Sequence, residues 1–102
     1  MKPVIFLHGA EEEMSEAARY YEQRNPGLGE MFLLRTRVAV RELAESPRAY
    51  TPIRAGIRRK LLRQFPYGVL YREDETEIVI IAIAHLRRRP GYWTRRTRGR
   101  SD

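Results

Sequence analysis

The chain has 102 residues, a formal net charge of +7 and no cysteine. One domain is expected at this length, and without cysteine neither a disulfide nor a thiolate metal site can form. The longest apolar run, Ile78–Ala84, is too short to span a bilayer, and residues 1–10 lack the pattern of a secretory signal. We therefore expect a cytoplasmic protein with one domain over residues 1–96 and a flexible tail over residues 97–102.

Positive charge is concentrated in the second half of the chain. Residues 1–50 contain 7 Lys and Arg against 8 Asp and Glu, whereas residues 51–102 contain 13 against 5. All but two of the 20 basic residues are arginine, which forms bidentate contacts with carboxylates and phosphates and tolerates burial at interfaces better than lysine. The second half is therefore expected to meet an acidic partner, either a nucleic acid or a protein surface.

The first half predicts one strand and two helices. Residues 4–8 are rich in β-branched and aromatic side chains, as in a strand. Residues 10–24 have glutamates in the first turn of a helix, where the helix dipole favours them, and apolar residues at helical spacing. Asn25-Pro26-Gly27 ends this helix, and a second helix with a wide apolar face follows over residues 28–45. The short link predicts an antiparallel hairpin, and residues 48–55 read as a surface loop.

The second half predicts three strands, because the apolar period changes from helical spacing to two at Gly56. The first strand has one face formed by Ile57, Arg59, Leu61, Arg63 and Phe65. Residues 69–72 and 77–85 form the next two strands, joined by an acidic loop. The unbroken apolar run of the last strand predicts burial on both faces and a central position in the sheet. Strict alternation places Ile78, Ile80, Ala82 and Ala84 on one face of it and Val79, Ile81, Ile83 and His85 on the other.

The predicted fold class is α+β with the order β-α-α-β-β-β. It consists of an N-terminal strand, an antiparallel two-helix hairpin, a three-stranded antiparallel meander and a short C-terminal tail or helix. The hairpin covers one face of a small, mostly antiparallel sheet. Few elements remain to cover the other face, which is the predicted docking surface.

A set of short motifs runs along nearly the whole chain in a fixed order. The C-terminal ones are Phe65-Pro66-Tyr67, Tyr71, the strand over residues 78–84, and then His85, Arg88, Pro90, Trp93 and Arg96. The upstream ones are Tyr20-Tyr21-Glu22, Pro26-Gly27-Leu28-Gly29, Phe32, Pro47 and Tyr50. With these motifs the sequence resembles the RelE/ParE superfamily of bacterial type II toxins, and it looks more like the ParE branch.

The resemblance implies a growth-inhibiting toxin encoded beside an antitoxin, whose extended segment wraps the toxin and blocks it. ParE-type toxins are gyrase poisons, whereas RelE-type toxins cut mRNA on the ribosome. The fold alone does not choose between these activities. The expected partners are therefore a cognate antitoxin together with either DNA gyrase or the ribosome and mRNA, and no membrane is involved.

The RNA-cleaving alternative needs specific groups. Metal-free cleavage requires a base for the 2′-hydroxyl, a proton donor for the leaving oxygen, and cations on the phosphate. By residue type, His85 is the candidate acid or base and Tyr92 the candidate proton donor. The candidate phosphate ligands are Arg59, Arg63 and Arg72. A complete set does not align position by position, and the alternative for His85 is a structural histidine that fixes the strand end and the tail.

The binding alternative relies on arginine. The candidates for contact with an antitoxin or a target are Arg58, Arg59, Arg63, Arg72, Arg87, Arg88, Arg89, Arg95 and Arg96. Arg59 and Arg63 can equally lie across an apolar surface with their charges in water. Tyr92 and Trp93 are interspersed with arginines as in a nucleic-acid patch, but we expect Trp93 to pack at the edge of the core.

Metal or cofactor chemistry is not expected. His8 and His85 are the only histidines in the sequence, and without cysteine they make a poor metal pair. The sequence contains no glycine-rich phosphate loop. The expectation is therefore a protein that works without a metal and without a cofactor.

Overall fold

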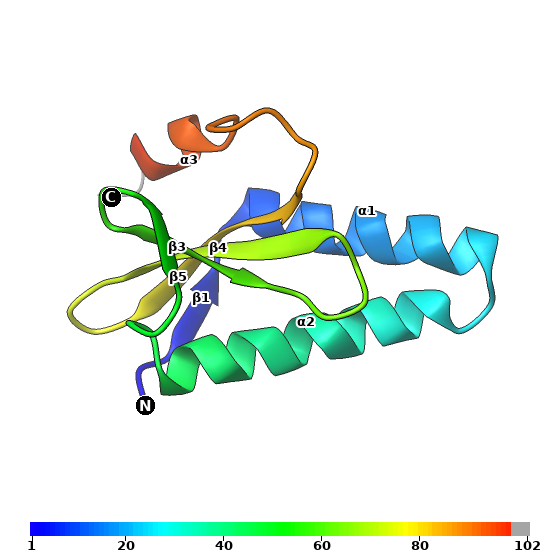
Figure 1. Cartoon of the computed structure of the whole chain (residues 1–102), viewed down its shortest axis with the longest axis horizontal. Coiled ribbons are helices and arrows are strands. Elements are labelled where there is room, and N and C mark those ends of the chain that lie inside the picture. The colour runs from blue at the N-terminus through cyan, green and yellow to red at the C-terminus, as the bar shows by residue number, and fades with distance from the viewer. Residues whose placement is uncertain (99–102) are drawn as a thin grey trace.

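The computed structural model describes residues 1–98. Its elements in chain order are β1 (Val4–Phe6), α1 (His8–Arg24), α2 (Leu28–Glu45), β2 (Thr51–Arg54), β3 (Ile57–Leu61), β4 (Tyr67–Glu73), β5 (Ile78–His85) and α3 (Thr94–Arg98). Helices α1 and α2 run antiparallel, as predicted, and α2 and α3 lie on opposite sides of the strands (Figure 1). In this part of the chain no helix is both long enough and apolar enough to cross a bilayer. Residues 97 and 98 belong to α3, and the rest of the predicted tail lies outside the described residues.

The five strands form one sheet in the order β1-β5-β4-β3-β2. The predicted antiparallel meander is confirmed as β3-β4-β5, and β5 has a neighbour on each side. Strand β1 pairs with β5 in parallel, so the sheet is mixed. A fourth strand follows the helices, because residues predicted as a loop form β2 at the edge of the sheet. Pro52 has no N–H for a ladder and is tolerated there because an edge strand needs only one partner.

The N-terminal strand is shorter than predicted. It ends at Phe6, and α1 begins at His8, because the carbonyl of Leu7 accepts the N–H groups of Ala10 and Glu11 at 3.0 and 3.1 Å. His8 is therefore an exposed residue of the first helical turn, 3.2 Å from the Glu12 carboxylate. The hydrogen bonds of the first turn of α1 outweigh the strand preference of Leu7 and His8 at the end of the predicted strand.

Strand β3 also ends earlier than the period-two pattern predicts. It stops at Leu61, and Gln64 has a positive φ of 76° that turns the chain. Phe65 consequently packs on the helix side, with its ring centroid 4.8 Å from Tyr21 and 5.2 Å from Phe32. The predicted face of five residues is thus wrong beyond Leu61.

Strand β5 contains a β-bulge that the sequence pattern did not predict. Leu70 pairs with Ala82 but Tyr71 pairs with Ile80, which leaves Ile81 as the extra residue. Ile81 and Ala82 therefore share a face, and every later side chain is reversed relative to strict alternation. Ala82 and Ala84 lie with Val79, whereas Ile83 lies in the helix-side core with Ile78 and Ile80. His85, opposite Tyr67, follows Ile83 to the helix side.

The helical hairpin packs closely because of Gly29. Glu22 accepts hydrogen bonds from the backbone N–H groups of Gly27 and Gly29 at 3.0 to 3.1 Å, so it caps the start of α2. A side-chain Cβ at position 29 would lie 2.5 Å from the carbonyl oxygen of Ala18 on α1. The two helix backbones meet at this point and leave no room for a methyl group.

Gly29→Ala is therefore expected to destabilise the protein. An exposed helical glycine replaced by alanine normally gains about 1 kcal/mol, but here the close contact should reverse the sign and cost about 2 kcal/mol. Urea unfolding measures the change, and the neighbouring exposed Glu30→Ala serves as the control with an effect within about 0.5 kcal/mol. A stabilised Gly29→Ala variant would contradict the described helix contact.

Tyr71 fastens the loop after α2 to the sheet. Its side chain is fully buried and its hydroxyl donates to the carbonyl of Pro47 at 2.6 Å. Burial raises the pKa of Tyr71 to about 12, although the nearby Arg58 charge opposes the shift. A tyrosine in the unfolded chain titrates near pH 10, so the folded protein keeps this proton more tightly than the unfolded chain does.

The raised pKa predicts a loss of stability in alkali. The contribution of Tyr71 is complete below pH 10 and is lost as the pH rises from 10 to about 12, in total about 3 kcal/mol. The measurement is the free energy of unfolding against pH for the wild type and Tyr71→Phe. The difference between the two proteins should shrink over this range, and a constant difference would contradict the assignment.

Candidate functional site

The face of the sheet opposite the helical hairpin is called the front face here. Its apolar cluster consists of Ile57, Leu70, Val79, Ile81, Ala82, Ala84 and Trp93, with Leu7 and Tyr92 packed against it. Trp93 is 4% exposed, as predicted for a packing role. The C-terminal segment, defined as residues 86–98, therefore covers part of the front face. The predicted bare docking surface is corrected to a face with a second, smaller core.

Glu13 of α1 holds the C-terminal segment in place. Its carboxylate accepts two hydrogen bonds from the Arg96 guanidinium at 2.9 and 3.1 Å and one from the Tyr92 hydroxyl at 2.5 Å. It also accepts the backbone N–H of Ile83 at 3.0 Å, while Arg96 donates to the carbonyl of Ile81 at 3.1 Å. One carboxylate thus joins α1, the bulged edge of β5 and the C-terminal segment.

The local electrostatics agree with this arrangement. The hydrogen bonds that Arg96 donates to the Glu13 carboxylate raise the pKa of Arg96. Burial, followed by the hydrogen bond to Glu13, raises the pKa of Tyr92, so its hydroxyl keeps its proton. Tyr92 is consequently engaged as a donor to a carboxylate, which does not suit the role of proton donor to a leaving oxygen.

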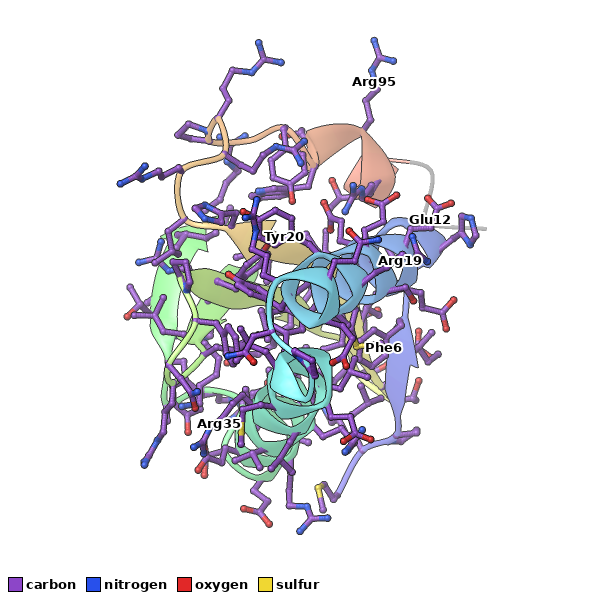
Figure 2. All side chains as sticks on the ribbon, turned by 90° about the vertical axis from the view of Figure 1, so that its right-hand side faces the viewer. Phe6, Glu12, Arg19, Tyr20, Arg35 and Arg95 are labelled. Carbon is purple, nitrogen blue, oxygen red and sulfur yellow. The ribbon has the colours of Figure 1, made fainter. Side chains whose placement is uncertain are left out.

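The segment presents four other arginines to solvent. Arg87, Arg88, Arg89 and Arg95 are exposed. The Arg88 guanidinium lies 3.8 Å from the centre of the Tyr92 ring, and Figure 2 shows Arg95 projecting from α3 away from the body of the molecule. Only Arg96, of the five arginines predicted here as binding residues, is instead taken up in an internal ion pair.

The arginines of the sheet do not form one group. Arg58 faces the helix side opposite Tyr71 and donates to the Tyr50 carbonyl at 2.8 Å. Arg72 forms a two-point ion pair with Asp74 at 2.7 and 3.3 Å. Arg63 is exposed in the turn after β3, and Arg59 lies on the front face, where it pairs with Leu70 of the apolar cluster.

The nuclease candidates are brought together only in part. Arg59, His85 and Tyr92 all line a cavity of about 190 Å³ between the front face and the C-terminal segment, whereas Arg63 and Arg72 do not. The Nδ1 atom of His85 accepts the backbone N–H of Arg87 at 3.0 Å, and its ring packs on Tyr67 with centroids 5.1 Å apart. His85 thereby links the end of β5 to the following turn.

Three residues of this region were not predicted from the sequence as part of the site. Glu13 was assigned only to the helix dipole, since its partner Arg96 is 83 positions away. Arg54 of β2 stacks on Trp93 at 5.5 Å and reaches Thr94 at 3.5 Å, but its strand was read as a loop. Gly68 makes room for the Arg59 side chain. The predicted strand begins at residue 69, whereas β4 begins at Tyr67, so the sequence pattern did not mark Gly68 as a strand glycine.

Comparisons with known proteins agree with this architecture. Residues 4–90 match the family model described as ParE toxin of type II toxin-antitoxin system, parDE. Toxin ParE2 of Mycobacterium tuberculosis, from the strains CDC 1551 / Oshkosh and ATCC 25618 / H37Rv, is 29% identical over 79 residues, which are 76% of this chain and 75% of the relative. A solved chain of the chromosomal ParDE TA system from P. aeruginosa superposes with a TM-score of 0.76 at 19% identity, covering 83% of this chain and 96% of that one. The chain therefore belongs to the ParE toxin family of type II toxin–antitoxin systems.

Proposed function

We propose that the chain is a cytoplasmic toxin that arrests growth by binding DNA gyrase and that a cognate antitoxin neutralises it. Membership of the ParE toxin family supports the antitoxin partner and makes gyrase the implied target. The observation that carries the binding mechanism is the C-terminal segment. Its backbone is fixed by Trp93, Tyr92 and Arg96, while four of its arginines extend into solvent.

A segment with a fixed backbone and exposed cationic side chains suits the binding of an acidic protein or protein–DNA surface. The fixed backbone lowers the entropy lost on association, and exposed arginines steer and orient an acidic partner. Cleavage of RNA is less well supported, because the Tyr92 hydroxyl is held by Glu13 and Arg72 by Asp74. The function therefore rests on contact rather than on bond breaking.

His85→Gln separates the two activities. If the toxin acts by binding, the variant should arrest growth on induction to within about threefold of the wild type, since the histidine has a structural role. If the toxin cuts RNA with His85 as acid or base, the variant should lose most of its activity. Transcript mapping after induction checks the same point, and cut transcripts that disappear in the variant would refute the binding mechanism.

A further inference from the structure

The cavity between the front face and the C-terminal segment is of a size to hold a single amino-acid side chain. Its volume is about 190 Å³, smaller than the roughly 300–1,000 Å³ of sites for drug-sized molecules. Apolar walls are supplied by Leu70, Ala84 and Trp93, and cationic groups by Arg54, Arg59 and Arg88. An anionic group on a short apolar stem is the ligand that this combination fits.

Arg59 has a buried side-chain nitrogen, Nε, that forms no hydrogen bond. Among the side-chain nitrogens and oxygens of residues 1–97, its Nε is the buried one without a hydrogen bond. The aliphatic part of Arg59 lies over Gly68, where a Cβ would come within 2.8 Å of Arg59 Cγ and 2.9 Å of Cδ. Because Gly68 has no side chain, the Arg59 stem can lie flat against β4. The buried Nε–H of Arg59 has no hydrogen-bond partner, which favours a ligand that accepts a hydrogen bond from it.

We propose that this cavity binds the carboxylate of a single Glu or Asp side chain of the antitoxin, which rests on the proposed function. The Nε and one Nη of a guanidinium form two parallel hydrogen bonds to a carboxylate. Apolar walls exclude water and strengthen these bonds. Ile53, Leu61 and Leu86, which are 38%, 47% and 48% exposed on the same face or beside it, offer contact to aliphatic neighbours of the acidic residue.

A nucleic-acid phosphate fits the same place less well. Binding of single strands combines a row of cations with aromatic rings on which bases stack. Here Trp93 is buried in the front cluster, and the Tyr92 ring has the Arg88 and Arg96 guanidiniums over it at 3.8 and 5.4 Å. Neither ring is free to receive a base, so the acidic peptide is the better ligand.

The first test measures antitoxin affinity by calorimetry with the full-length chain. Arg59→Gln is expected to weaken binding roughly tenfold to hundredfold, as for loss of a charge-assisted buried hydrogen bond. Arg59→Lys keeps the charge without the paired donors and should lose nearly as much. Gly68→Ala, which displaces the Arg59 stem, should do the same. The control is Arg63→Gln, an exposed arginine in the turn after β3, with a change below about threefold.

The second test uses N-acetyl-glutamate methylamide as a probe and needs no antitoxin. The Nε–H resonance of Arg59 in the ¹⁵N-labelled protein should shift saturably with this probe and remain unchanged with the glutamine analogue. A shift with both analogues, with neither, or with a short RNA instead would overturn the carboxylate site. If Arg59→Gln weakens the antitoxin complex no more than Arg63→Gln does, the proposed role of Arg59 in antitoxin binding is overturned. If the wild type forms no complex with the antitoxin, the proposed neutralisation is wrong. The antitoxin is then not the source of the carboxylate either.

Discussion

Glu13→Ala is expected to lower the free energy of unfolding by about 3 kcal/mol, since removing one partner leaves a largely buried charge uncompensated. The Glu13 and Arg96 side chains are only 14% and 26% exposed. The substitution also leaves the Tyr92 hydroxyl and the Ile83 N–H without their acceptor. Urea unfolding of the purified protein gives the value.

The same substitution should release the C-terminal segment. Hydrogen exchange at the Ile83 amide, which donates to Glu13, is expected to accelerate, and trypsin should cut the arginines of the segment faster. Glu16→Ala, one turn along α1 and exposed, is the matched control and should change stability by less than about 0.5 kcal/mol. Equal stabilities for the two variants would mean that Glu13 does not anchor the segment.

Phe32→Ala is expected to cost about 4 kcal/mol, within the range for removing a buried aromatic ring. The Phe32 side chain is fully buried on α2, and its ring lies 5.0 to 5.6 Å from those of Tyr21, Phe65 and Tyr67. This cluster joins the helical hairpin to the turn after β3 and to the start of β4. Its loss should therefore destabilise the fold as a whole rather than one edge of it.

Leu34→Ala on the same helix is the control for Phe32. Its side chain is 42% exposed, so truncation should cost less than about 1 kcal/mol. Chemical denaturation of both variants in parallel gives the comparison. If the two changes were equally costly, the helix-side core would be centred elsewhere.

The sequence predicts the helices and the meander well because their signals are local. The helix end at Asn25-Pro26-Gly27 is fixed by backbone chemistry, and α2 buries Phe32, Thr36, Ala39 and Leu43, which recur at helical spacing. Strand β2 was missed because Pro52 and its exposed neighbours look like a loop, and an edge strand needs little burial. The bulge at Ile81 was missed because β5 is apolar on both faces, so no change of pattern marks the slip.

The sequence predicted the candidate site only as an excess of positive charge in the second half of the chain. Counting arginines identifies the basic half, but the faces on which they lie depend on where β3 ends and on pairings across the sheet. Arg58 was separated from Arg59 correctly by alternation, whereas the capture of Arg96 by Glu13 depends on a contact 83 residues apart. The Arg59 cavity likewise depends on Gly68, which is adjacent only through strand pairing.

The most direct test of the account is a gyrase supercoiling assay with the wild-type chain and an Arg87→Gln, Arg88→Gln, Arg89→Gln triple variant. These side chains are exposed, so the triple variant should remain folded. We predict that the wild type inhibits supercoiling and that the triple variant loses at least about tenfold in potency, because arginine is enriched among the interface residues whose loss costs about 2 kcal/mol or more. Unaltered supercoiling with the wild type, or equal inhibition by both proteins, would contradict it.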